Sequence, residues 1–155
     1  VAGIVFTGGC QTKGPAQTPE ELGKRVAQAL IAGDKNSLGV LLPPYEAYLP
    51  MCSLNLGEGT HAKTDLQKFY SKRMGKLKEE IQAFPSEFAR ETSFKTSQID
   101  AIDVYRQKVG SRTNWTDVDV IFRVKDAKFL LTLDECLRFN NAWYLVDLDW
   151  MGKQK

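Results

Sequence analysis

The clearest strand pattern in the chain is Trp115-Thr116-Asp117-Val118-Asp119-Val120-Ile121-Phe122-Arg123-Val124-Lys125. Apolar side chains occupy every second position from Val118 to Val124, and Asp117, Asp119 and Arg123 lie between them. Successive side chains of a strand point to opposite faces, so this alternation predicts a strand with one buried face and one wet face.

Strand signals continue on both sides of this stretch. The expected strands are residues 99–107, 115–125, 129–139 and 142–150. Residues 110–114 and 125–128 predict turns, and Asn140-Asn141 is typical of a hairpin turn because asparagine tolerates positive φ. Strands joined by such short turns pair as antiparallel neighbours.

The first half of the chain predicts helices. Thr18 can cap a helix that begins at Pro19, Glu21 completes a capping box, and Gly33 ends it. A second short helix is expected from Asp34 to Leu42, ended by Pro43-Pro44. The apolar face of the first helix is Leu22, Val26, Ala29 and Leu30.

Residues 43–63 predict an irregular segment, because prolines and glycines punctuate it. A long helix is expected from Thr64 to Phe84, ended by Pro85, with one more turn at residues 86–91. Its lysines indicate a solvated face. Its expected apolar stripe is Leu66, Phe69, Tyr70, Leu77 and Ile81.

Helices followed by an antiparallel meander predict an α+β fold, an antiparallel sheet with N-terminal helices packed on one face. The 155 residues suffice for one domain, which we place at residues 18–155. The net charge of +2 gives no electrostatic footprint for nucleic acid, so we expect no nucleic-acid partner.

The N-terminal residues 1–17 resemble the end of a bacterial lipoprotein signal peptide followed by a tether. An apolar run leads to Gly8-Gly9-Cys10, and a polar spacer follows. Lipid on Cys10 would anchor the domain to a membrane, and Gln11 after it is compatible with the periplasmic face of the outer membrane. An ordinary first strand with a Gly-Gly turn is the alternative. Thr7 stands where a lipobox usually has a leucine-like residue.

Two cysteines remain when Cys10 is set aside. In an oxidising compartment Cys52 and Cys136 could form a disulfide. The alternative is two buried thiols that act as small apolar residues.

The opening and the closing stretches resemble nuclear transport factor 2-like (ketosteroid isomerase-like) domains. The opening carries Thr18-Pro19-Glu20-Glu21-Leu22 and a helix that ends in Ala32-Gly33-Asp34, and residues 137–148 are similar to the last hairpin of that superfamily. The resemblance covers about residues 18–150. It implies a cone-shaped sheet around helices, with a pocket at the wide end, in a superfamily that includes isomerases, dehydratases and proteins with no known activity.

Glu135 is the carboxylate with the least obvious role. Simple alternation along residues 129–139 turns it inward, where an unpaired charge is costly. Three explanations stay open: its head reaches water at the sheet edge, a bulge changes the phase so that Leu130, Asp134 or Cys136 exchange faces, or it is a pocket acid.

The predicted pocket is lined by Tyr45, Tyr48, Met51, Phe122 and Glu135. Aromatic filling of the core is the alternative for the two tyrosines and Met51. His61 is the only histidine, and its spacing pairs it with no nucleophile. We expect no metal site and no cofactor, because no cluster of metal-ligand residues is present.

Three functions remain open. The favoured one is a lipid-anchored, non-enzymatic domain of the cell envelope that binds a small apolar ligand or an envelope partner. The second is a pocket enzyme of isomerase or dehydratase type, with Glu135 as base and Tyr45 or Tyr48 as proton donor. The third is a structural module that forms a homodimer through its outer sheet face.

Overall fold

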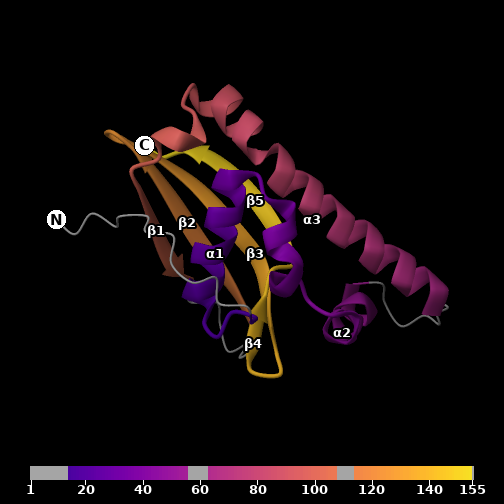
Figure 1. The fold of residues 1–155 in the computed structure, drawn as a ribbon. Helices are drawn as coiled ribbons and strands as arrows, with labels where there is room; N and C mark the ends of the chain where they lie inside the picture. Colours follow the sequence, from indigo (N-terminus) through magenta and orange to yellow (C-terminus); the bar gives the residue numbers. More distant parts are fainter. Residues whose placement is uncertain (1–13, 56–62, 108–113, 155) are drawn as a thin grey trace.

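Helices and sheet form two layers, with the helices on one face of a curled antiparallel half-barrel sheet (Figure 1). This computed structural model describes residues 14–55, 63–107 and 114–154, without the side chains of residues 51–55, 63 and 64. The predicted α+β fold, a curved sheet on N-terminal helices, is confirmed. It has the cone-like form of nuclear transport factor 2-like and cystatin-like architectures.

Every strand pairing in the described sheet is antiparallel, as predicted. The strands β1, β2 and β3 are neighbours in that order, and β4 and β5 both pair with β3. Burial alternates residue by residue along β2, so residues 115–124 form the predicted strand with one buried and one wet face. The bounds are β1 Ala101–Arg106, β2 Trp115–Val124, β3 Ala127–Phe139, β4 Ala142–Tyr144 and β5 Asp147–Lys153.

Helix α1 (Pro19–Ala32) begins and ends as its sequence predicts. The Thr18 hydroxyl accepts a hydrogen bond of 3.1 Å from the backbone N–H of Glu21. Gly33 adopts a φ of 62° at the other end, a conformation that glycine reaches without steric cost. The predicted apolar face is buried, and α1 lies across β1 and β2 (Figure 1).

The segment predicted to be irregular contains a helix. After the short helix η1 (Lys35–Leu41) and Pro43-Pro44, helix α2 runs over Tyr45–Asn55. Its first turn forms where the backbone N–H of Tyr48 donates to the carbonyl of Pro44, and Pro50 lies within it. The prediction was therefore wrong for residues 45–55, where a helical turn accommodates the proline that was expected to exclude it.

Helix α3 (Lys63–Thr92) does not end at Pro85, contrary to the prediction. A proline inside a helix costs about 3 kcal/mol. Phe84 and Phe88, on either side of it, are both buried, and burial of each aromatic ring contributes roughly 1.5–3 kcal/mol. Packing of this helix on the sheet therefore outweighs the local penalty.

The last predicted strand is divided into β4 and β5. At the division the backbone N–H of Leu145 donates to the carbonyl of Leu41 at the end of η1, 2.8 Å away. Leu145 and Val146 are both fully buried, which strict alternation does not allow. The strand is interrupted here because the consecutive side chains of Leu145 and Val146 both pack into the core.

Aromatic rings fill the space between the helices and the sheet. Phe88 has its ring centroid 5.5–6.0 Å from those of Phe84, Phe122, Phe129 and Trp150. Phe122, a predicted pocket residue, is therefore part of a filled core.

Helix η2 (Thr96–Gln98) connects α3 to β1.

Candidate functional site

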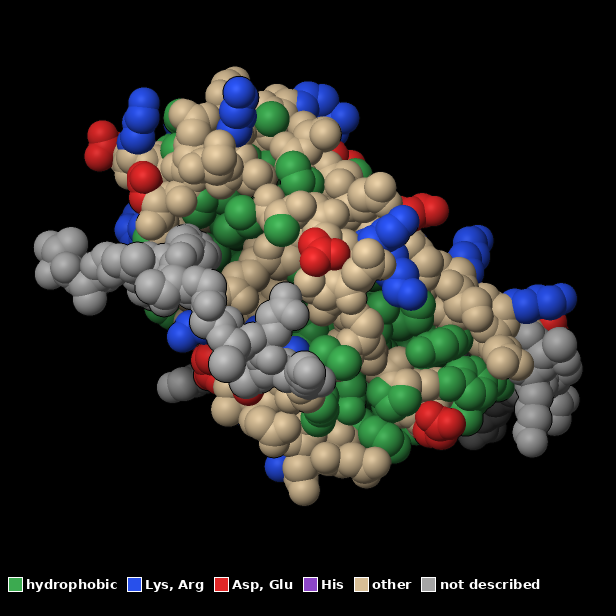
Figure 2. Space-filling view, in the orientation of Figure 1, with side chains coloured by type: hydrophobic (Ala, Val, Ile, Leu, Met, Phe, Trp, Pro, Cys, Tyr) green, Lys and Arg blue, Asp and Glu red, His purple; other side chains and the backbone are tan. Residues whose placement is uncertain are grey.

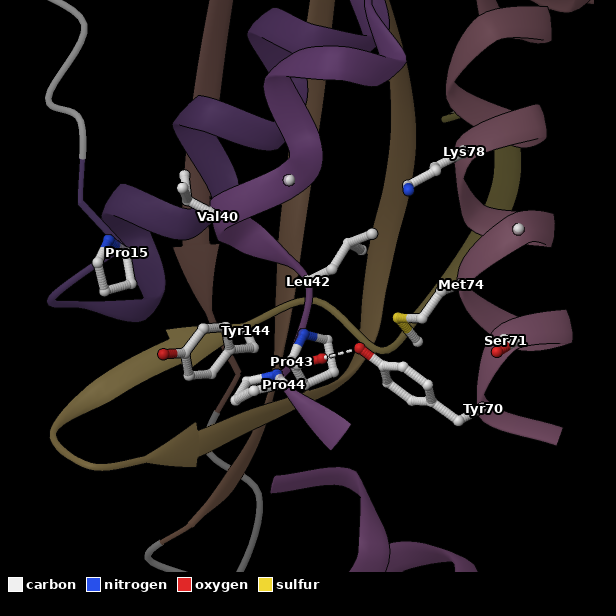
Figure 3. Close-up of a pocket in the computed structure, with 12 residues that line it drawn as sticks. Pro15, Val40, Leu42, Pro43, Pro44, Tyr70, Ser71, Met74, Lys78 and Tyr144 are labelled. Atoms are coloured by element: carbon white, nitrogen blue, oxygen red, sulfur yellow. Dashed lines mark hydrogen bonds between the residues drawn. The ribbon is translucent and has the colours of Figure 1, made fainter. Parts of the chain in front are cut away.

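An open hollow lies between η1, α3 and the β4 hairpin (Figure 3). Its volume is about 620 Å³, which is within the roughly 300–1,000 Å³ range of small-molecule sites. The described residues that line it are Pro15, Gly39, Val40, Leu42, Pro43, Pro44, Tyr70, Ser71, Met74, Gly75, Lys78 and Tyr144.

Helical spacing places one wall of the hollow. Tyr70, Met74 and Lys78 follow one another at intervals of four residues, so they lie on one face of α3. The facing wall is the end of η1 with Val40 and the Pro43-Pro44 pair. Figure 2 shows hydrophobic side chains gathered on this part of the surface, between β4 and α2.

Tyr70 connects the two walls. Its hydroxyl donates a hydrogen bond of 2.7 Å to the backbone carbonyl of Pro43. Burial, and then the carboxylate of Glu46, raises the pKa of Tyr70 above its ordinary value. The hydroxyl therefore stays neutral at physiological pH and acts as a structural donor that fixes the shape of the hollow.

The predicted tyrosines lie behind Tyr70, outside the described lining of the hollow. The rings of Tyr45 and Tyr48 each have their centroid 5.4 Å from that of Tyr70. Tyr48 is 3 % exposed. The two tyrosines therefore support the wall formed by α3 without themselves lining the hollow.

Glu135 lies in a bulge of β3. Of the three explanations for its predicted inward direction, the structure therefore has the second, a bulge that changes the phase of the strand. Thr116 pairs with Cys136 and Val118 with Leu133, so Asp134 and Glu135 together face Asp117. Glu135 has a φ of 57°, its side chain is exposed, and its backbone N–H donates to Asp117 Oδ1 at 3.0 Å. Because of the bulge, Cys136 points inward and Glu135 points outward. The structure does not bring Glu135 together with Tyr45 or Tyr48, so the predicted base and proton donors do not form one site.

Cys136 is a free thiol in the structure and is fully buried. Burial raises the pKa of this thiol well above its ordinary range, with smaller contributions from Asp117 and Asp134. The predicted bridge to Cys52 is not formed from Cys136 in the structure. The side chains of Cys52 and Met51, together with Cys10 and His61, lie outside the described residues.

The outer face of the sheet is polar. Arg123 forms an ion pair with Asp103, and Asp119 accepts hydrogen bonds of 2.8 Å from Gln107 and from Thr132. These contacts place Asp119 and Arg123 on the wet face, as the sequence predicts, and Asp103 lies there with them.

Several acidic side chains lie together at the end of this outer face. Burial, and then the neighbouring charges of Asp117, Glu135 and Asp147, raises the pKa of Asp134 to about 6. Among the described residues, no group of three or more His, Cys, Asp or Glu side chains is arranged to hold a metal ion.

Sequence reasoning missed the residues that line the hollow. The signal was present in two places: the Tyr70, Met74 and Lys78 spacing on one helix face, and the small residues Gly39 and Gly75. A Cβ added at either glycine would meet no atom within 4 Å, so both glycines border open space.

Comparison with known proteins finds no relative: no family model, no curated protein and no solved structure matches the chain. The structure therefore defines a fold class, an antiparallel cone-like sheet backed by helices, with an open hollow among the described residues. In the described parts of the chain, no helix has the length and apolar character needed to cross a bilayer.

Proposed function

We propose that this chain is a lipid-anchored, non-enzymatic domain of the bacterial cell envelope that binds a small apolar ligand in the hollow. The observation that carries the proposal is the hollow itself, with its volume of about 620 Å³ and its proline, valine, leucine, methionine and tyrosine lining. Burial of an alkyl chain against such a lining contributes about 0.8 kcal/mol per methylene.

The start of the described chain, residues 14–16, lies beside the hollow. Arg25 Nη1 donates to the carbonyl of Gly14 at 2.7 Å, and the backbone N–H of Trp143 donates to the carbonyl of Ala16 at 2.8 Å. Pro15, between them, lines the hollow. Residues 10–15 can span at most about 18 Å at roughly 3.6 Å per residue, so lipid on Cys10 would hold the hollow near the membrane surface.

A gap-filling substitution tests ligand binding. Gly75 lines the hollow, and a side chain there meets open space. We expect Gly75→Leu to weaken the binding of 1-decanol about tenfold, because the leucine side chain would occupy space that about two methylenes of the ligand fill, at about 0.8 kcal/mol each. Gly75→Ala, which adds one methyl group, is the matched control.

Binding is measured by amide NMR shifts of the 155-residue chain titrated with 1-decanol. Shifts confined to Val40, Met74, Tyr144 and their neighbours are expected, and their absence would overturn the ligand proposal. The anchor is tested by mass spectrometry of the membrane fraction, with Cys10→Ala as control. An unmodified Cys10 in that fraction would refute the lipoprotein interpretation.

A further inference from the structure

The hollow has one charged residue among its described lining, Lys78. Its side chain is exposed, and it extends from α3 over the hollow toward η1 (Figure 3). Lys76, two residues earlier, pairs with Glu80, whereas Lys78 forms no ion pair with a carboxylate of the described residues. Within the described parts of the chain, the Lys78 ammonium therefore lies beside an apolar surface without a carboxylate partner.

The charge along the hollow is asymmetric. Lys78 lies eight residues beyond Tyr70 on α3, about 12 Å along the helix axis at 1.5 Å per residue. Glu46 lies near the Tyr70 end, close enough for its charge to act on the tyrosine hydroxyl. A ligand with one negative charge is therefore attracted at the Lys78 end and repelled at the other.

We infer that the hollow binds an alkyl chain that carries a single anionic head group, with the head against Lys78 and the chain along Met74, Leu42 and Pro43 toward Tyr144. This rests on the proposed ligand-binding function and names the chemical class of the ligand. A fatty acid carboxylate and a lipid phosphate share this chemistry.

The experiment compares two probes of equal chain length, decanoate and neutral 1-decanol. Lys78→Met removes the charge and keeps most of the apolar stem, and Lys72→Met removes a charge from an exposed residue of α3 that is not part of the described lining. We expect Lys78→Met to weaken decanoate binding about threefold to fivefold, as for a partly exposed ion pair, and to leave 1-decanol binding unchanged. Lys72→Met should change neither.

The salt dependence gives a second readout. The difference between the wild type and Lys78→Met for decanoate should shrink between low salt and about 1 M salt, where the Debye length is about 3 Å. If Lys78→Met affects both probes equally, or affects decanoate no more than Lys72→Met does, the inference is wrong and ligand binding stands. If the wild type binds neither probe, the proposed function falls as well.

Vesicles distinguish the two sources of the ligand. Sedimentation of the chain with phosphatidylglycerol vesicles but not with phosphatidylcholine vesicles, lost in Lys78→Met and kept in Lys72→Met, would assign the head group to a membrane lipid. Binding of decanoate without vesicle sedimentation would assign it to a free fatty acid. The inference fails if neither decanoate nor phosphatidylglycerol distinguishes the two lysine variants.

Discussion

At the residue scale, the bulge at Asp134 and Glu135 changes which side chains of β3 are buried and which are exposed. A non-glycine residue at positive φ costs about 1–2 kcal/mol, and Glu135 adopts a φ of 57°. The hydrogen bond from its backbone N–H to Asp117 and the inward placement of Cys136 offset that cost. The acid that alternation turned inward is thereby moved to the surface, and Asp134 joins a group of like charges.

Asp134 predicts a pH dependence of stability. Its pKa of about 6 in the folded chain exceeds the ordinary value of 3.8, so the folded state binds this proton more tightly than the unfolded state does. Stability therefore falls as the pH rises from about 4 through 6. We expect Asp134→Asn to raise the free energy of unfolding by about 1 kcal/mol at pH 7.5, a value reduced for solvent screening, and by almost nothing at pH 4.

Urea denaturation across this pH range measures the difference from the wild type. Asp126→Asn, in the exposed turn between β2 and β3, is the control, with an expected change within about 0.5 kcal/mol. A gain for Asp134→Asn that does not decrease on acidification would contradict the electrostatic explanation.

At the element scale, two glycines in helices have opposite roles. Gly23 of α1 faces the sheet, where an added Cβ would lie 2.6 Å from Val104 Cγ1 and 2.9 Å from Val118 Cγ1. Gly75 of α3 faces open space. Close packing of α1 on β1 and β2 therefore requires a glycine at position 23, whereas a Cβ added at position 75 would meet no atom within 4 Å.

The same substitution should have opposite effects at these two positions. Alanine in place of glycine gains about 0.5–1 kcal/mol of helix propensity. We expect Gly75→Ala to show this gain, and Gly23→Ala to lose about 1–3 kcal/mol because overpacking outweighs it. Thermal and urea unfolding measure both, and an equal gain at the two positions would show that α1 can move away from the sheet at little cost.

At the scale of the whole molecule, one aromatic cluster joins the helices to the sheet. Phe88 of α3 is 1 % exposed and contacts rings from α3, β2, β3 and β5. Arg73 of the same helix ties its first half to Asp147 of β5, with 2.9 Å between Nη2 and Oδ2. Helix and sheet therefore share one core and should unfold together.

Removal of the Phe88 ring tests whether the helix and the sheet unfold together. We expect Phe88→Ala to lower the free energy of unfolding by about 3–5 kcal/mol, the usual cost of truncating a buried aromatic residue. The loss should be the same by far-ultraviolet circular dichroism and by tryptophan fluorescence. Phe69→Ala, at a position 41 % exposed on the same helix, should cost much less. Two separate transitions for Phe88→Ala would mean that the helices and the sheet unfold independently.

Local patterns in the sequence were sufficient for the fold class. The alternation in residues 115–125, the cap at Thr18 and the turn at Asn140-Asn141 each depend on interactions within a few residues, and the structure has all three. The second hydrogen bond of the predicted capping box differs, because the Glu21 carboxylate accepts from the backbone N–H of Gln17 and not from that of Thr18. Helix α2 and the continuation of α3 through Pro85 were not predictable in this way, because packing on distant residues overrides their local signals.

Periodicity and capping act over short distances, so local patterns in the sequence were enough to predict an antiparallel sheet backed by N-terminal helices. The place of the hollow, with Lys78 beside it and Glu135 outside its described lining, follows instead from how the elements pack together. Those positions depend on the phase of a bulge and on the meeting of α3 with η1 and β4, which are contacts between residues far apart in the chain.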